Sequence, residues 1–288
     1  MFPGFRLLDV ATSGTTIRLR TGGSGPPLLL LHGYPQTHAL WHKIAPRLSR
    51  RFTVVAADLR GYGDSGKPET THDHAPYSKR AMAQDMAEAM SLLGHDRFLV
   101  CGHDRGARVA HRLALDHASR VDKLAVLDIA PTREMYRDTT DRFARAYWHW
   151  FFLITPAPFP ERMIGADPDD YWLKKCGAGA AGLKPFSPEA LSDYLRCFRD
   201  PRMIHASCED YRAAATIDIA HDDADGARKL ACPLLVLWGK NGVIESCFDA
   251  LALWRERATD VRGHALPGGH YLAEEVPKLV ADALEQFF

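Results

Sequence analysis

The sequence predicts an α/β fold built around a mostly parallel sheet of eight strands, and three observations support this prediction. Short, continuous apolar runs, such as the four leucines at residues 28–31, are typical of parallel strands that are buried on both faces. Segments with helical periodicity alternate with these runs, as they do in doubly wound sheets. The alternation is interrupted once, at residues 133–226, where helical patterns and aromatic residues replace the strands.

The sequence pattern in the first half of the chain predicts six strands and two long helices. Residues 5–10 and 15–20 alternate between apolar and polar positions, which favours edge strands. The other four strands are expected at residues 28–31, 52–57, 98–101 and 124–127. The helices are expected at residues 78–93, where Ser78 is a suitable N-cap, and at residues 105–117.

The strand pattern resumes after residue 226. Strands are expected at residues 233–239 and 261–265, and helices at residues 245–257 and 277–288. We therefore predict a core domain from residues 1–132 and 227–288, with a helical cap inserted at residues 133–226. Within the cap, Trp148 and Phe152 are expected to contribute to the apolar interior.

The composition argues against several classes of function. The 36 Lys and Arg residues balance the 36 Asp and Glu residues, so the formal net charge is +0. Without a long basic run there is no electrostatic basis for binding nucleic acid or an anionic membrane surface. The 6 cysteines form no Cys-x-x-Cys pair, which favours reduced thiols over a metal site. We see neither a signal peptide nor a membrane-spanning run, so we expect a cytoplasmic protein.

The strongest local motif is Gly-His-Asp-Arg-Gly at residues 102–106, between a predicted strand and a predicted helix. This is the setting of a nucleophile elbow, a sharp turn that raises one side chain above the edge of the sheet. Glycines are needed beside such a turn because a Cβ atom would clash there. The raised residue is Asp104, which could alternatively be only a cap of the helix.

Several motifs together resemble the α/β-hydrolases. Residues 32–35 (His-Gly-Tyr-Pro) are similar to the oxyanion loop of that fold, and residues 58–65 are similar to its loop after the next strand. An aspartate at the elbow is similar to the dehalogenase and epoxide hydrolase branches of the family. Residues 102–112, 147–150 and 210–212 resemble fluoroacetate (haloacetate) dehalogenases in particular.

The resemblance carries implications for the oxyanion donors, cofactors and partners. It implies that the backbone N–H groups of Tyr34 and Arg105 stabilise an oxyanion. It also implies a small haloacid substrate, no metal or organic cofactor, and a homodimer.

An aspartate nucleophile suits attack on a saturated carbon. Its carboxylate is ionised at neutral pH and can displace a leaving group directly, which leaves an ester on Asp104. Hydrolysis of that ester needs a general base, and His270 after the last predicted strand is the candidate. Two positions could supply the residue that orients the histidine, Asp128 and Asn241. We predict Asp128, for which a loop cap is the alternative role.

Two arginines follow the predicted nucleophile on one helix face. Cations are unfavourable at a helix N-terminus, so Arg105 and Arg108 indicate a functional demand. Their guanidinium groups could hold a substrate carboxylate, which favours a small α-halo acid over a neutral haloalkane. A structural ion pair is the alternative for each arginine, and the resemblance favours the carboxylate role for both.

A departing halide needs hydrogen-bond donors as its negative charge develops. The resemblance implies that His149, Trp150 and Tyr211 supply them. The predicted function is therefore hydrolysis of haloacetate, such as fluoroacetate or chloroacetate, to glycolate and halide.

Two other functions remain as alternatives. An epoxide hydrolase would use the same nucleophile and base, with Tyr211 and Tyr147 as proton donors; the arginine pair and the position of Asp128 argue against it. A non-catalytic ligand-binding member of the fold is disfavoured by the complete set of nucleophile, acid and base. An esterase is disfavoured because no serine occupies the elbow.

Overall fold

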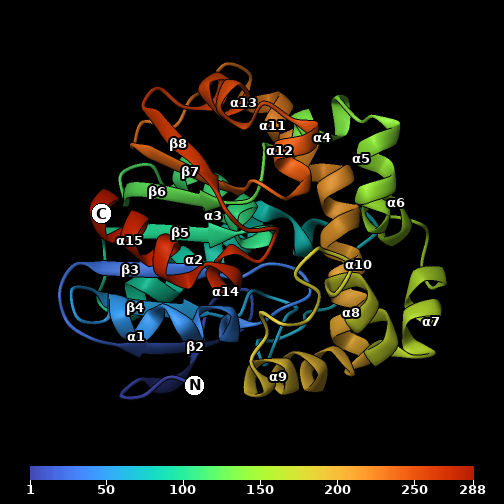
Figure 1. The fold of residues 1–288 in the computed structure, drawn as a ribbon, viewed down its shortest axis with the longest axis horizontal. Coiled ribbons are helices and arrows are strands. Elements are labelled where there is room, and N and C mark those ends of the chain that lie inside the picture. Colours follow the sequence, from blue (N-terminus) through green and yellow to red (C-terminus); the bar gives the residue numbers. More distant parts are fainter.

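The computed structural model describes residues 1–288 and is organised around one eight-stranded sheet (Figure 1). The strands are β1 (Arg6–Ala11), β2 (Thr16–Gly22), β3 (Pro27–Leu31), β4 (Thr53–Ala57), β5 (Phe98–His103), β6 (Val121–Leu127), β7 (Leu234–Gly239) and β8 (Val261–Leu266). Their order is β1-β2-β4-β3-β5-β6-β7-β8. Strands β1 and β2 pair antiparallel with their neighbours and the remaining pairs are parallel. The mostly parallel sheet predicted from the sequence is confirmed.

The central strands are buried on both faces, which explains their continuous apolar runs. Leu29 and Val55 belong to the apolar cluster on the face that packs against α2 and α3, whereas Leu28 and Val54 belong to the cluster on the opposite face. Successive side chains of a strand point to opposite faces, so both faces need apolar residues.

The helices outside the region between β6 and β7 flank the sheet or connect its strands. They are α1 (Ala45–Leu48), α2 (Lys79–Leu92), α3 (Arg105–Asp116), α12 (Val243–Cys247), α13 (Ala250–Arg257), α14 (Leu272–Glu275) and α15 (Pro277–Phe287), with 3-10 helices η1 (His38–Lys43) and η2 (Ala75–Tyr77). Ser78 caps α2 as predicted, because its side chain accepts a hydrogen bond from the Ala81 N–H.

Between β6 and β7 the chain forms helices only, and most of them gather on one side of the molecule beyond the strand ends (Figure 1). They are α4 (Thr132–Arg137), α5 (Asp141–Ala146), α6 (Trp148–Leu153), α7 (Phe159–Gly165), α8 (Pro168–Cys176), α9 (Pro188–Phe198), α10 (Pro201–Ala215) and α11 (Ile217–Asp225). We call α4–α11 the cap. The long helix α10 contacts α6, α7, α9 and α11 and also touches α2 of the core, so it joins the two parts.

Two expectations about local structure were wrong. The single helix expected at residues 245–257 is two helices, α12 and α13. The chain is extended at Phe248, and Asp249 caps the second helix by accepting from the Ala252 N–H. Trp148 does not lie in the interior of the cap, since 46% of it is exposed. None of the helices is both long enough and apolar enough to cross a membrane.

Candidate active site

The predicted elbow lies between β5 and α3, and its backbone is strained. Asp104 has φ 48° and ψ −118°, a backbone conformation that residues other than glycine rarely adopt. The flanking glycines permit this turn: a Cβ atom on Gly102 would lie 2.6 Å from the Cα of Ala107, and one on Gly106 would collide with the carbonyl oxygen of His32. The strain raises the carboxylate above the end of β5.

The carboxylate of Asp104 is buried and surrounded by donors and cations. Its Oδ1 accepts a hydrogen bond from the Tyr34 backbone N–H at 2.8 Å. Gly33 lets this loop approach, because a Cβ atom there would collide with the Asp104 side chain. Burial alone would raise the pKa of Asp104, but electrostatic interactions with neighbouring basic side chains, led by His270 and including Lys175 and Arg105, hold that pKa well below its usual range. The group is therefore an anion at neutral pH.

His270 connects Asp104 to a second carboxylate. Its Nε2 lies 3.8 Å from Oδ2 of Asp104, and its Nδ1 lies 2.7 Å from Oδ2 of Asp128. The Gly239 backbone N–H donates to the other oxygen of Asp128 at 2.9 Å, which fixes this carboxylate. Burial raises the pKa of Asp128, and its hydrogen bond to His270 opposes that effect. Of the two positions considered from the sequence, Asp128 and not Asn241 makes the hydrogen bond to His270.

Two residues that the sequence analysis missed hold the loop of His270. The carboxylate of Glu275 accepts from the backbone N–H of Gly269 at 2.7 Å and from that of Tyr271 at 2.9 Å, so it fixes the chain on both sides of the histidine. Nε2 of His103 lies 2.8 Å from the carbonyl oxygen of His270. The sequence does show a glutamate five residues after the loop histidine, but the local pattern does not predict which backbone N–H groups that glutamate binds.

Arg105 and Arg108 have different kinds of partner in the protein. Arg105 pairs with the buried carboxylate of Asp210, from Nε at 2.9 Å and from Nη2 at 2.7 Å, while its Nη1 has no partner in the protein. Asp210 also pairs with Lys79. Arg105 thus makes the structural ion pair considered as the alternative, with one nitrogen left free.

Arg108 has only neutral acceptors. Its Nη1 donates to the carbonyl oxygen of Ala130 at 3.1 Å and to the Thr132 hydroxyl at 2.8 Å, and its Nη2 lies 3.2 Å from the sulfur of Met135. Its Nε has no partner, and no carboxylate forms an ion pair with it. Arg108 is therefore not engaged in an ion pair, and the protein anion that acts on its charge is Asp104.

The three residues expected at the halide lie close to these arginines. Trp150 Nε1 and the Tyr211 hydroxyl are buried donors without an acceptor in the protein. The Arg105 guanidinium lies 4.1 Å from the ring centre of Tyr211, and that of Arg108 lies 4.7 Å from the ring centre of Trp150. Burial lowers the pKa of His149 well below its usual range, so its ring is neutral and one nitrogen carries a hydrogen.

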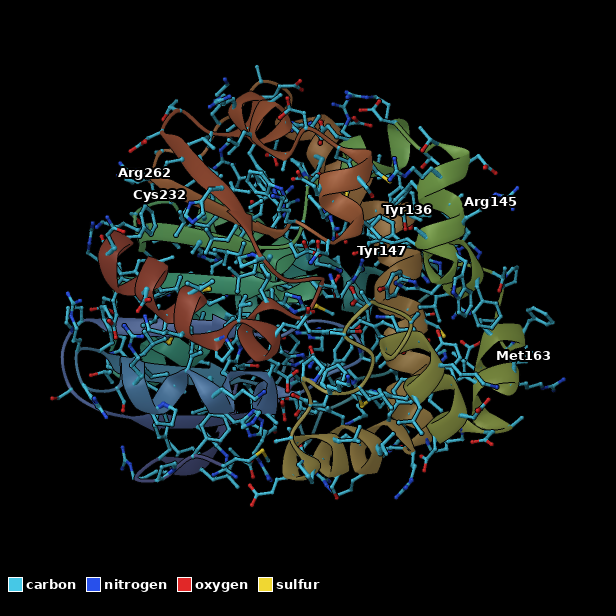
Figure 2. The ribbon with its side chains drawn as sticks, viewed as in Figure 1. Tyr136, Arg145, Tyr147, Met163, Cys232 and Arg262 are labelled. Atoms are coloured by element: carbon cyan, nitrogen blue, oxygen red, sulfur yellow. The ribbon has the colours of Figure 1, made fainter.

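Tyr147 lies where the cap meets the core, whereas Arg145 and Met163 lie on the outer side of the cap (Figure 2). The hydroxyl oxygen of Tyr147 is 3.2 Å from Nδ1 of His270. That nitrogen already donates its hydrogen to Asp128, so the hydroxyl of Tyr147 can only share the same N–H as a second acceptor.

A cavity of about 720 Å³ connects this region to the surface. Its walls come from both cap and core and include Tyr147, His149, Lys175 and His270. Asp104 does not itself line the cavity, but His270, whose Nε2 lies 3.8 Å from Oδ2 of Asp104, does, so the cavity ends beside the residues that surround the carboxylate.

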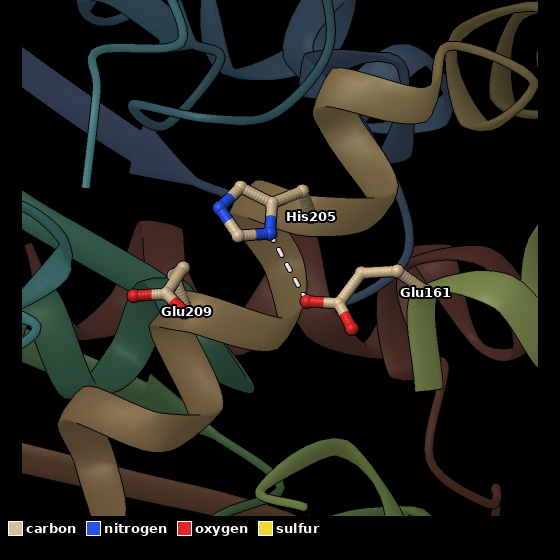
Figure 3. A group of neighbouring side chains, drawn as sticks. All are labelled: Glu161, His205 and Glu209. Atoms are coloured by element: carbon tan, nitrogen blue, oxygen red, sulfur yellow. Dashed lines mark hydrogen bonds and ion pairs between the residues drawn. The ribbon is translucent and has the colours of Figure 1, made fainter. Parts of the chain in front are cut away.

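One other cluster combines metal-binding residue types, namely Glu161, His205 and Glu209 in the cap (Figure 3). Their charges are already paired. Arg212 Nη1 lies 2.7 Å from oxygens of both glutamates, and His205 Nδ1 lies 3.0 Å from Glu161. Because a guanidinium already bridges the two carboxylates, we interpret the cluster as an ion-pair network that joins α7 to α10.

Comparisons with known proteins agree with this fold. A family model described as the alpha/beta hydrolase fold matches residues 26–277, and the chain belongs to that family. The fold and the family together define a hydrolase.

Within the family, the chain is similar to enzymes with two named activities. It is 51% identical to the fluoroacetate dehalogenase of Burkholderia sp, over 100% of this chain and 95% of that protein. It is 34% identical to the soluble epoxide hydrolase of Corynebacterium sp. (strain C12), over 96% and 94%. A solved structure of an α/β hydrolase from Nostoc sp PCC 7120 superposes with a TM-score of 0.97 at 58% identity, covering 100% and 99% of the two chains. The resemblance stated from the motifs is confirmed.

Proposed function

We propose that the protein hydrolyses haloacetates, such as fluoroacetate or chloroacetate, to glycolate and halide. One observation carries the proposal: an ionised aspartate lies among buried donors that have no acceptor in the protein. These donors are Arg105 Nη1, Arg108 Nε, Trp150 Nε1 and the Tyr211 hydroxyl. Buried donors are normally satisfied, so such a group is suited to a ligand that brings its own acceptors, here a carboxylate and a developing halide.

In the first step Asp104 attacks the α-carbon of the haloacid. Since the Tyr34 N–H holds Oδ1, Oδ2 is the oxygen free to form the new C–O bond. The carbon–halogen bond breaks and its electron pair leaves with the halide, toward His149, Trp150 and Tyr211. Arg105 and Arg108 hold the substrate carboxylate and align the carbon for attack from the opposite side.

In the second step water hydrolyses the ester. Nδ1 of His270 donates to Asp128, so Nε2 is free to take a proton from water. The separation of 3.8 Å between Nε2 and Oδ2 of Asp104 exceeds a hydrogen bond and suits a water molecule beside the ester. Negative charge then develops on Oδ1, where the backbone N–H groups of Tyr34 and Arg105 are the oxyanion donors. When this intermediate collapses, the bond between the Asp104 carbonyl carbon and the glycolate oxygen breaks, and that oxygen takes the proton back from His270. The carboxyl group of Asp104 then loses its proton to solvent and is regenerated as the carboxylate.

Epoxide hydrolysis is the second candidate, because the Tyr211 hydroxyl is a buried, free proton donor and a 34% identical relative is an epoxide hydrolase. Two features favour the haloacid instead. The hydroxyl of Tyr147, the other expected donor, lies against His270. The uncompensated charge of Arg108 also suits an anionic substrate better than a neutral epoxide.

The test measures halide release from fluoroacetate and chloroacetate, with styrene oxide as the neutral comparison. We expect halide and glycolate from wild type and neither from Asp104→Asn. A single turnover in ¹⁸O-labelled water should place ¹⁸O in Asp104, because hydrolysis replaces one carboxylate oxygen. Diol formation from styrene oxide without halide release from either haloacetate would refute the proposal.

A further inference from the structure

The proposed reaction brings a second anion beside an ionised aspartate, so the positive charges around Asp104 decide whether the substrate can bind. Arg105 adds little net charge, because its ion pair with Asp210 is buried. Two other cations near the carboxylate form no ion pair with any protein carboxylate. One is Arg108, deep in the site, and the other is Lys175 on the cavity wall.

Lys175 lies in the last turn of α8 and reaches toward the elbow. Its Nζ is 3.2 Å from the Tyr271 hydroxyl and 3.4 Å from the carbonyl oxygen of Tyr34. It also lies 5.0 Å from the centre of the Tyr34 ring. Tyr34 donates its N–H to Asp104, and Tyr271 follows the base in the chain, so the ammonium group lies between the two loops that form the site.

The other charged groups of the cavity do not cancel this charge. Burial raises the pKa of Glu274 to about 8, so this carboxyl is mostly neutral at pH 7. Glu275 is engaged by two backbone N–H groups. Lys43 donates to carbonyl oxygens, and Lys184 is exposed at the rim. The positive charge of Lys175 also lowers the pKa of His149, after the larger effect of burial, and that of Asp104, where burial raises the pKa and His270 and His103 lower it more than Lys175 does, so its field reaches the reacting atoms.

We propose that Lys175 is a specificity-determining residue: its ammonium group provides the second uncompensated positive charge that allows a carboxylate substrate to bind beside ionised Asp104. Arg108 offsets one negative charge and Lys175 the other, from opposite sides of the substrate. Lys175 thereby selects anionic haloacids over neutral halides and epoxides of the same size. This inference rests on the proposed function, which it deepens.

The first test separates KM from kcat. The two negative charges are present in both the bound state and the transition state, so Lys175 should stabilise both equally. We expect Lys175→Met to raise KM for chloroacetate about ten-fold, an effect of the size that one partly screened charge produces. The kcat should stay within about two-fold of wild type. Lys175→Arg keeps the charge and should restore KM, and Lys184→Met, in the same cavity, should leave KM nearly unchanged.

The second test uses binding of glycolate, followed by calorimetry, and does not require turnover. The dissociation constant should rise about ten-fold in Lys175→Met and return toward the wild-type value in Lys175→Arg. If wild type bound glycolate in this pattern but released no halide from haloacetates, the proposed function would fail while the carboxylate site remained.

Three results would overturn the inference. One is glycolate affinity within two-fold of wild type in Lys175→Met. Another is a loss of glycolate affinity in Lys184→Met equal to that in Lys175→Met, which would mean that only the total charge of the cavity matters and not the position of Lys175. The third is no saturable binding of glycolate to wild type.

Discussion

Asp104 shows how much of the chemistry is decided by the neighbours of one residue. Its backbone has a positive φ at the elbow after β5, the Tyr34 N–H holds one carboxylate oxygen, and neighbouring basic side chains keep the carboxylate ionised. A carboxylate with a strongly lowered pKa stays charged across the physiological range. Trp150 and Tyr211, the proposed donors to the halide, have no competing acceptor in the protein and are available for a leaving anion.

At this scale we predict that Tyr211→Phe slows fluoride release more than chloride release. The variant removes one hydrogen bond to a developing anion, which is worth about 1.5–3 kcal/mol and so about 10–100-fold in rate. Fluoride concentrates its charge more than chloride and depends more on such donors. Single-turnover measurements of halide release from the two haloacetates provide the comparison. Equal slowing of both would argue against contact between this hydroxyl and the leaving group.

At the scale of elements, the site is formed by loops that follow parallel strands. Asp104 follows β5 and Asp128 follows β6, and these strands pair in parallel, so their ends lie at the same edge of the sheet. His270, the proposed base, lies on the loop after β8, and a loop needs separate support. Glu275 at the end of α14 provides it by binding the amides on both sides of His270.

We therefore predict that Glu275→Gln impairs hydrolysis of the ester more than its formation. The amide side chain offers one acceptor oxygen in place of two, so His270 loses part of its positioning and the second step slows, by about ten-fold or more. Mass spectrometry of acid-quenched reactions should then detect alkylated Asp104. Glu245→Gln, on α12, is the matched control and should not accumulate the ester. Parallel loss of both steps in Glu275→Gln would point to a general structural defect instead.

At the scale of the whole molecule, buried polar contacts connect cap and core. Glu274 of α14 accepts from Gln36 at 2.5 Å and from the hydroxyl of Tyr194 at 3.1 Å, so it joins the residue that follows the oxyanion loop to α9 of the cap. Such a junction makes the geometry of the site dependent on how the cap sits on the core.

This junction should make stability depend on pH. The pKa of Glu274 is about 8 in the folded protein, because of its burial, and about 4.3 in an unfolded chain. Between these values the unfolded state releases a proton that the folded state keeps, so this group lowers the free energy of unfolding as pH rises. Glu274→Gln removes that dependence, and its stability relative to wild type should increase from pH 5 to pH 8. Urea unfolding at several pH values measures the difference, and a constant difference would contradict the assignment.

The sequence alone determined the features that depend on local patterns. Buried parallel strands require continuous apolar runs, and a tight turn between strand and helix requires glycines, so the sheet, the elbow and Asp104 could be predicted. The chain order of the fold led to Asp128 and His270 in the same way.

Only the tertiary structure decided which side chains meet across the sheet and the cap. Asp210 pairs with Arg105 across 105 residues of sequence, Lys175 comes from the cap to the oxyanion loop, and Trp148 faces outward. Helical periodicity states which face of a helix is apolar, but not against which element that face packs. Charge compensation within the site depends on such long-range contacts, and therefore the division of roles between Arg105, Arg108 and Lys175 required the folded chain.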